Sequence, residues 1–249
     1  MHTKQTLLSN LARLGINQKG TLLVHSSYKA IGQVEGRADA VLDTLMEFMK
    51  DGLLVLPAHT WNHVQAGTNP VMDVLYTPSC VGILPEIFRT RPGVCRSLHP
   101  THSVAAIGAG ADALIEGEEN ITTPCGKGGA HYKLWERNAQ ILLIGVNFTR
   151  NTFVHGIEEW DGAEGAISRE KTDLYTIDYS GKRLYTPQYR HCAPLGSETF
   201  TKLEPAALNK GIVTLGMFGD ATTRLMSTHP LRKMAAACLK ANPRHLLGH

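Results

Sequence analysis

The sequence predicts an α/β fold of three layers, in which helices flank a largely parallel central sheet. Two observations support this class. Short apolar runs typical of buried strands alternate along the chain with amphipathic segments typical of helices. The 24 glycines suit the tight turns that join strands to helices. At 249 residues the chain is long for one domain and short for two, so we expect a single domain over residues 1–249 with a lobe at residues 161–199.

The first quarter of the chain is expected to form a helix followed by a strand–helix–strand unit. Residues 7–15 predict the first helix, because three leucines recur at helical spacing before a glycine. Apolar runs predict buried strands at Thr21–Val24 and Leu53–Leu56. Asp39 is a candidate N-cap for the helix between them. The apolar side of that helix would consist of Val41, Leu45, Phe48 and Met49.

Later elements are separated by longer polar stretches. Residues 58–79 are rich in Asn, Thr, Pro and His without periodicity, which predicts a long covering or functional loop. Residues 174–179 and 182–186 alternate in character around Ser180-Gly181, which predicts an antiparallel hairpin added to the sheet. Further strands are expected at 103–107, 141–145 and 212–217, and further helices at 81–89, 111–115 and 230–241.

Composition excludes several classes of function. The net charge of +3 is small and no Lys/Arg run exceeds two residues, so we expect no nucleic-acid partner. No apolar run approaches the ~20 residues of a membrane span, so we expect no membrane partner. The five cysteines form no CxxC pair, and free thiols in a reducing cytoplasm are the simplest interpretation. The predicted location is therefore cytoplasmic.

The segment 139–160 is the most informative for function. A buried strand at 141–145 leads through a polar loop into a helix that carries Thr152, His155 and Glu158. Ligands and catalytic groups gather at the carboxyl ends of strands in α/β sheets. A histidine with an acid three residues later on one helical face can act as a general base whose imidazolium the carboxylate stabilises. An ordinary surface ion pair is the competing interpretation.

Three further stretches could bind phosphate or approach a ligand. Residues 25–29 (HSSYK) follow the first strand and offer hydroxyls, backbone N–H groups and a lysine. The stretch 123–130 is rich in small residues and lets the backbone approach a ligand closely. A basic loop suited to diphosphate contains Arg89, Arg91, Arg96, His99 and His102. Each stretch could equally be a solvated turn or loop.

Histidine spacing raises an alternative from another class of enzyme. His59 and His63 are four residues apart, and His99 and His102 are three apart, spacings that could supply metal ligands. A metal-dependent hydrolase using these four residues is therefore an alternative. No HExxH or HxHxDH pattern accompanies them.

Five stretches, in order, resemble the aminoglycoside 3-N-acetyltransferase, or antibiotic N-acetyltransferase, family. They are HSSYKAIG, LLVLPAHTW, GVCRSLHPTHSVAAIG, TPCGKGGAHYKL and ILLIGVNFTRNTFVHGIEE. The resemblance covers about residues 5–240. It implies transfer of an acetyl group from acetyl-coenzyme A to an amine, without a metal, on an α/β fold distinct from that of histone-acetyltransferase-like enzymes.

The resemblance also implies roles for individual residues. His155 would be the general base, Glu158 would orient it, and Thr152 would hydrogen-bond the oxyanion of the tetrahedral intermediate. Two stretches, the 25–29 turn and the 96–103 loop, would hold coenzyme A. Their residues are His25, Ser26, Ser27, Lys29, Arg96, Ser97, His99 and Ser103.

The implied acceptor is a small amine, in the first instance the 3-amino group of an aminoglycoside, with another amine as the alternative. Family members that modify aminoglycosides present acidic surfaces, whereas this chain is slightly basic. We expect residues 161–199 to determine the acceptor. A coenzyme A-binding protein without catalysis is a further alternative, and a homodimer is one of the oligomeric states left open.

Overall fold

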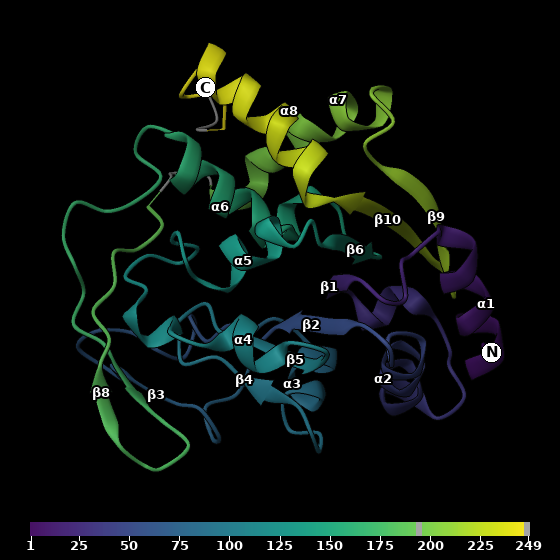
Figure 1. The fold of residues 1–249 in the computed structure, drawn as a ribbon, viewed down its shortest axis with the longest axis horizontal. Coiled ribbons are helices and arrows are strands. Elements are labelled where there is room, and N and C mark those ends of the chain that lie inside the picture. Colours follow the sequence, from purple (N-terminus) through teal and green to yellow (C-terminus); the bar gives the residue numbers. More distant parts are fainter. Residues whose placement is uncertain (193–195, 247–249) are drawn as a thin grey trace.

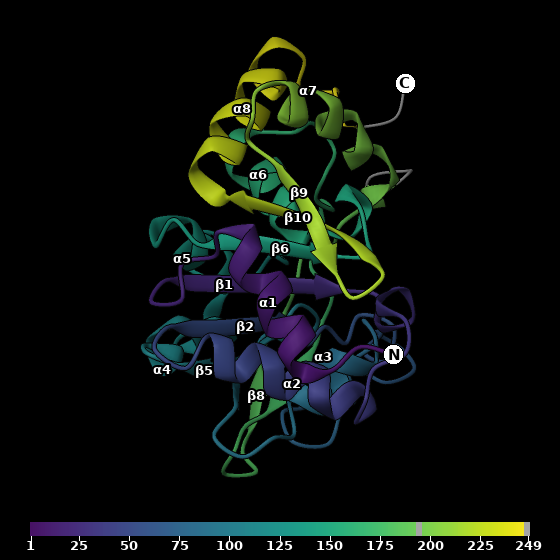
Figure 2. The ribbon, with the colours of Figure 1, turned by 90° about the vertical axis from the view of Figure 1, so that its right-hand side faces the viewer.

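The computed structural model describes residues 1–192 and 196–246, in which helices cover both faces of a seven-stranded sheet (Figures 1 and 2). The strand order is β4-β5-β2-β1-β6-β10-β9. The strands are β1 (Thr21–Ser26), β2 (Leu53–Pro57), β4 (Cys95–Arg96), β5 (Val104–Gly108), β6 (Gln140–Ile144), β9 (Thr214–Phe218) and β10 (Ala221–Ser227). The predicted α/β fold with a central sheet between helices is confirmed.

Parallel pairing is concentrated at the centre of the sheet. β1 pairs in parallel with β2 on one side and with β6 on the other. The outer pairs are antiparallel, so that β5 and β10 run opposite to the other five strands of the sheet. Since the carboxyl ends of β1, β2 and β6 meet at one edge, this edge is where a ligand site is expected.

The central strands are apolar along their whole length because both of their faces are buried. In β1, Leu22 and Val24 belong to one hydrophobic core, whereas Leu23 belongs to the other. The first core lies against α1 (Lys4–Leu14), α2 (Arg37–Phe48) and α3 (Ile83–Phe88), and Figure 2 shows α1 and α2 in front of the sheet. The second core lies against α4 (Ala111–Ile115), α5 (Ala130–Glu136), α6 (Thr152–Asp161), α7 (Glu204–Asn209) and α8 (Thr228–Ala241).

A small second sheet contains the predicted hairpin. β7 (Tyr175–Ile177) and β8 (Arg183–Tyr185) pair antiparallel, which confirms the hairpin expected around Ser180-Gly181. β3 (Val71–Asp73) adds to β7 in parallel, so part of the stretch expected to be a loop forms a strand. The small sheet lies at the left of Figure 1.

Some elements differ from the sequence prediction at their ends or were not predicted. α2 begins at Arg37, so Asp39 lies in its first turn instead of capping it, and Gly36 with φ of +76° occupies the cap position. α8 begins at Thr228, and Pro230 lies in its first turn, where the missing N–H breaks no helical hydrogen bond. β10, α5 and α7 were not predicted at all. Over the described ranges, no helix combines the length and the apolar character needed to cross a bilayer.

Gly145, directly after β6, is a position where glycine is required. Its φ is +64°, and a Cβ at this position would overlap the Cβ of Ala30. We expect Gly145→Ala to lower the free energy of unfolding by about 2–4 kcal/mol, from strain in the left-handed region plus steric overlap. Urea denaturation measures this change.

Gly67→Ala is the matched control for that prediction. Gly67 has φ of +83°, but a Cβ there would meet no atom within 4 Å. This variant should therefore show only the backbone strain, about 1 kcal/mol. Equal losses in the two variants would show that overlap with Ala30 contributes nothing.

Candidate active site

A cavity of about 1000 Å³ opens at the carboxyl ends of the three parallel strands. Residues 25–29 line it at the end of β1 and directly after it, Pro57 and His59 line it at the end of β2, and Gly145 and Val146 line it after β6. This is the edge of the sheet at which the sequence predicted functional groups. The parallel centre of the sheet therefore positions the site.

His155 and Glu158 form a hydrogen-bonded pair on α6. His155 lines the cavity, and its Nδ1 lies 2.8 Å from Oε2 of Glu158. The Glu158 side chain is 1% exposed, which shields the pair from competing water. Because a carboxylate accepts the Nδ1 proton, Nε2 of His155 is left as the ring nitrogen that can take a proton from a ligand. This arrangement can act as a general base.

Thr152 lies one turn before His155 and also lines the cavity. It is the first residue of α6, where backbone N–H groups have no partner inside the helix. A hydroxyl and free N–H groups at a helix start can stabilise a developing negative charge. The structure therefore places Thr152 and His155 on one cavity wall, with Glu158 behind His155.

The turn after β1 faces the same cavity. His25, Ser26, Ser27 and Lys29 all line it. Nε2 of His25 and Oγ of Ser26 are buried without a hydrogen-bond partner in the described part of the chain. Burial lowers the pKa of His25 to about 3, so its imidazole is neutral at pH 7. These polar atoms can serve a bound ligand.

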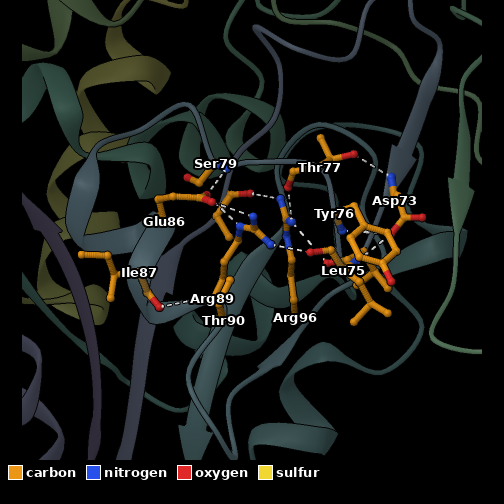
Figure 3. A network of polar contacts seen from close by, with 12 residues as sticks. Asp73, Leu75, Tyr76, Thr77, Ser79, Glu86, Ile87, Arg89, Thr90 and Arg96 are labelled. Carbon is orange, nitrogen blue, oxygen red and sulfur yellow. Dashed lines mark hydrogen bonds and ion pairs between the residues drawn. The ribbon is translucent and has the colours of Figure 1, made fainter. Parts of the chain in front are cut away.

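Within the 96–103 loop, the side chains of Arg96 and Ser103 contact protein groups, whereas His102 lines the cavity. Arg96 is buried, and its guanidinium donates to the carbonyl oxygen of Thr77 at 2.6 Å (Figure 3) and to that of Ala58 at 2.7 Å. It also donates to Oγ of Ser103 at 3.1 Å. Among the described residues that line the cavity, neither Arg96 nor Ser103 is present. Their polar groups stabilise the protein interior.

Ser97 and His99 are likewise engaged inside the protein. Oγ of Ser97 donates to Glu118 at 3.1 Å. Nδ1 of His99 accepts the backbone N–H of His102 at 2.9 Å, and its Nε2 lies 3.1 Å from the carbonyl oxygen of Thr123. Neither side chain is among the described lining of the cavity. These two side chains therefore do not share the cavity with the 25–29 turn.

The two other arginines of the predicted basic loop are also paired. Arg89 donates to Glu86 at 2.7 Å, as Figure 3 shows, and Arg91 binds both Asp39 and Asp43. The pattern of basic residues at 89–96 thus reflects ion pairs and buried carbonyl contacts. Glu86 lies three residues before Arg89, whereas Asp39 and Asp43 come from a distant segment that no local pattern links to Arg91.

A second histidine–glutamate pair was not predicted. The ring of His191 stacks on that of His155, with centroids 4.0 Å apart and planes 24° apart. Nε2 of His191 lies 2.9 Å from Oε1 of Glu159, and burial raises the pKa of Glu159 to about 7. His191 lies in a segment without periodicity, so no local pattern could have linked it to α6.

Further buried histidines extend from this stack. The rings of His102 and His191 have centroids 5.3 Å apart, and those of His59 and His102 are 4.7 Å apart. His131 follows at 6.1 Å from His59. Burial lowers the pKa of His131 to about 3 and that of His99 to about 4, and lowers the pKa of the other three well below its usual value. The cluster is therefore neutral at pH 7.

The four histidines predicted as alternative metal ligands do not face the cavity together. Across residues 1–192 and 196–246, no three His, Cys, Asp or Glu side chains are arranged to hold a metal ion. His99 is held by backbone groups at both ring nitrogens. His59 and His102 line the cavity, whereas His63 is not among its described lining.

Comparison with known proteins identifies the family. A family model described as aminoglycoside 3-N-acetyltransferase matches residues 23–240. An aminoglycoside N(3')-acetyltransferase-like protein, YokD, of Bacillus subtilis (strain 168) is 28% identical, over 90% of this chain and 88% of its own length. Aminoglycoside N(3)-acetyltransferase IV of Salmonella sp is 27% identical, over 96% of this chain and 88% of its own length.

A solved structure shares the fold. The structure of AAC-IIIb in binary complex with CoASH superposes with a TM-score of 0.85 at 22% identity, covering 96% of this chain and 97% of its own. Because the family model spans most of the sequence and the cavity carries the predicted histidine–glutamate pair, the assignment rests on both sequence and structure. This chain belongs to the aminoglycoside 3-N-acetyltransferase family.

Proposed function

We propose that this chain transfers the acetyl group of acetyl-coenzyme A to an amino group of a small acceptor, by direct attack and with His155 as general base. The observation that supports this most is the buried Glu158 carboxylate that holds Nδ1 of His155 at the edge of the cavity. An alkylammonium group is protonated at neutral pH and cannot attack a thioester until it loses a proton. A base is therefore the group that the reaction needs most.

Each residue has a defined part in this reaction. Nε2 of His155 takes a proton from the ammonium, and Glu158 stabilises the imidazolium that forms. The amine then attacks the thioester carbonyl carbon, and Thr152 with the N–H groups at the start of α6 stabilises the oxyanion. When the C–S bond breaks, the coenzyme A thiolate takes up the proton held by His155, and the second proton lost by the attacking nitrogen passes to solvent. No covalent intermediate on the protein is required.

The 25–29 turn is the proposed binding site for coenzyme A. Ser26, Ser27 and Lys29 line the cavity and offer two hydroxyls and one charge to phosphate or pantetheine oxygens. The CoASH complex of AAC-IIIb supports coenzyme A as the co-substrate of this fold. Arg96, Ser97, His99 and Ser103 take no direct part in this proposal, because their polar atoms bind protein groups.

The acceptor is proposed to bind between α6 and the 161–199 segment. Arg190, His191, Gly196 and Ser197 of that segment line the cavity, which supports its predicted substrate-facing role. Residues 193–195, which fall inside the segment, lie outside the described residues. The names of the relatives make the 3-amino group of an aminoglycoside the first acceptor to test.

Thiol release from acetyl-coenzyme A, measured with a panel of amines, tests the proposed function. Amine-dependent thiol release with an acetylated product of the expected mass is the supporting result. Binding of coenzyme A without release by any amine would indicate a binding protein. Activity abolished by EDTA and restored by zinc would support the hydrolase instead.

Glu158→Gln should lower kcat by about 10–100-fold, because the amide keeps a hydrogen-bond acceptor for Nδ1 but cannot stabilise the imidazolium by charge. Steady-state kinetics with a saturating acceptor measures this loss. Glu164→Gln is the matched control, since the side chain of Glu164 is 64% exposed. An unchanged kcat in Glu158→Gln would mean that the pair is structural.

A further inference from the structure

The charged side chains in the described lining of the cavity are all cationic. Lys29, Arg150 and Arg190 line it, and its described lining contains no Asp or Glu. Glu158 and Glu159 lie behind the two imidazoles, where each carboxylate holds a histidine nitrogen. An acceptor with several ammonium groups would therefore meet cations and neutral rings here. Such juxtaposition of like charges costs affinity and slows encounter.

Of the three cations, Arg190 is the one that belongs to the 161–199 segment, which is proposed to face the acceptor. Lys29 belongs to the 25–29 turn proposed for coenzyme A, and Arg150, which follows β6, is exposed. Arg190 instead precedes His191, whose ring stacks on that of His155 at 4.0 Å. Its backbone N–H donates to Oγ of Ser168 at 2.9 Å, which fixes this part of the chain. Arg190 thus belongs to the acceptor side of the cavity.

The guanidinium of Arg190 is half-buried and has no ion pair or side-chain hydrogen bond within the described residues. The other arginines of low exposure all have partners. Arg89, Arg91, Arg224 and Arg232 bind carboxylates, and Arg96 binds carbonyl oxygens. A partly desolvated guanidinium without a partner costs free energy, which a bound anion can offset. Burial alone lowers the pKa of Arg190, which is consistent with the lack of a carboxylate beside it.

We propose that the acceptor carries an anionic group, a carboxylate or a phosphate, in addition to its reacting amine, and that Arg190 binds this group. The inference rests on the proposed N-acetyltransferase function and names the class of acceptor. A guanidinium binds two oxygens of a carboxylate or phosphate at once, which fixes orientation as well as distance. With the anion held at Arg190, the amine of a small acceptor can be presented to Nε2 of His155.

Paired acceptors that differ in charge test this inference. Glycine is compared with glycinamide, glucosamine 6-phosphate with glucosamine, and sisomicin serves as a polycation. The readout is kcat/KM from thiol release, with the KM for acetyl-coenzyme A measured alongside. We expect the anionic member of at least one pair to be favoured by about 10–100-fold. Sisomicin should be a poor acceptor.

Variants of Arg190 then test whether this residue causes the preference for the anionic acceptor. Arg190→Gln should raise the KM of the anionic acceptor and remove its advantage over the neutral acceptor, while the KM for acetyl-coenzyme A stays unchanged. Arg190→Lys should retain part of the advantage. Arg169→Gln is the control, because Arg169 is exposed in the same segment and is not among the described lining.

The contrary outcomes are distinct. Acetylation of sisomicin or of the neutral members in preference to the anionic ones would overturn the acceptor class and leave the proposed function standing. A rise in the KM for acetyl-coenzyme A alone in Arg190→Gln would assign Arg190 to the cofactor and overturn its role here. If no acceptor, whether anionic, neutral or cationic, supported thiol release, the proposed function and the acceptor class would both be overturned.

Discussion

Replacing His155 with alanine is expected to lower kcat for acetyl transfer by about 10²–10⁴-fold, the usual contribution of a positioned general base. The size of the effect follows from the geometry. His155 is held by Glu158 at 2.8 Å and lines the cavity, whereas the neighbouring His191 is engaged by Glu159 through Nε2. The stacked neighbour therefore has no free Nε2 with which to replace the lost base.

Two measurements make this prediction specific to catalysis. Binding of coenzyme A, measured by calorimetry, should change little in His155→Ala, because the 25–29 turn proposed for the cofactor is untouched. His63→Ala is the control, since His63 is not among the described lining of the cavity. A kcat within a few-fold of the unmodified chain would remove His155 from the mechanism.

The fold was predictable to the extent that burial shows in the sequence. β1, β2 and β6 are buried on both faces, which produces continuous apolar runs that mark them as central strands. β10 was missed because polar residues, Thr222 to Arg224, occupy its first half. The direction of β5 relative to β2 was not predictable either, since pairing depends on contacts between distant segments.

The site was predictable where its residues share one element. His155 and Glu158 lie on one face of α6, so their spacing alone predicted the pair. His191 and Arg190 come from a distant segment, and only folding brings them beside α6. For Arg96, the sequence suggested a phosphate contact because the residue is basic and was expected in a loop. In the structure its guanidinium binds backbone carbonyl oxygens of distant residues, which no sequence pattern indicates.

Lowering the pH from 7 to 5 is expected to destabilise the protein strongly, because six buried histidines resist protonation in the folded state. Burial lowers the pKa of each of them, to about 3 for His25 and His131, to about 4 for His99, and well below the usual value for the rest. The unfolded chain binds these protons as the pH falls through about 6.5. Stability that is present above that pH is therefore lost on acidification. The six residues are His25, His59, His99, His102, His131 and His191.

Two buried carboxyl groups act in the opposite direction but are outnumbered. Burial raises the pKa of Glu118 and of Glu159 to about 7, so the folded state keeps protons that the unfolded chain releases above about 4.5. Their contribution to stability falls as the pH rises between those values. Each net proton taken up on unfolding changes the free energy of unfolding by about 1.4 kcal/mol per pH unit. With six histidines against two carboxyl groups, the loss toward acid dominates.

Urea denaturation at pH 7, 6 and 5 measures the net proton uptake directly from the slope of the free energy of unfolding against pH. His131→Gln should reduce that slope by about one proton, because it removes one group that is neutral when folded and charged when unfolded. His229→Gln is the matched control variant, since His229 is exposed at the start of α8. Stability that increases from pH 7 to pH 5 would mean that the two carboxyl groups, and not the histidine cluster, control the response of this fold to acid.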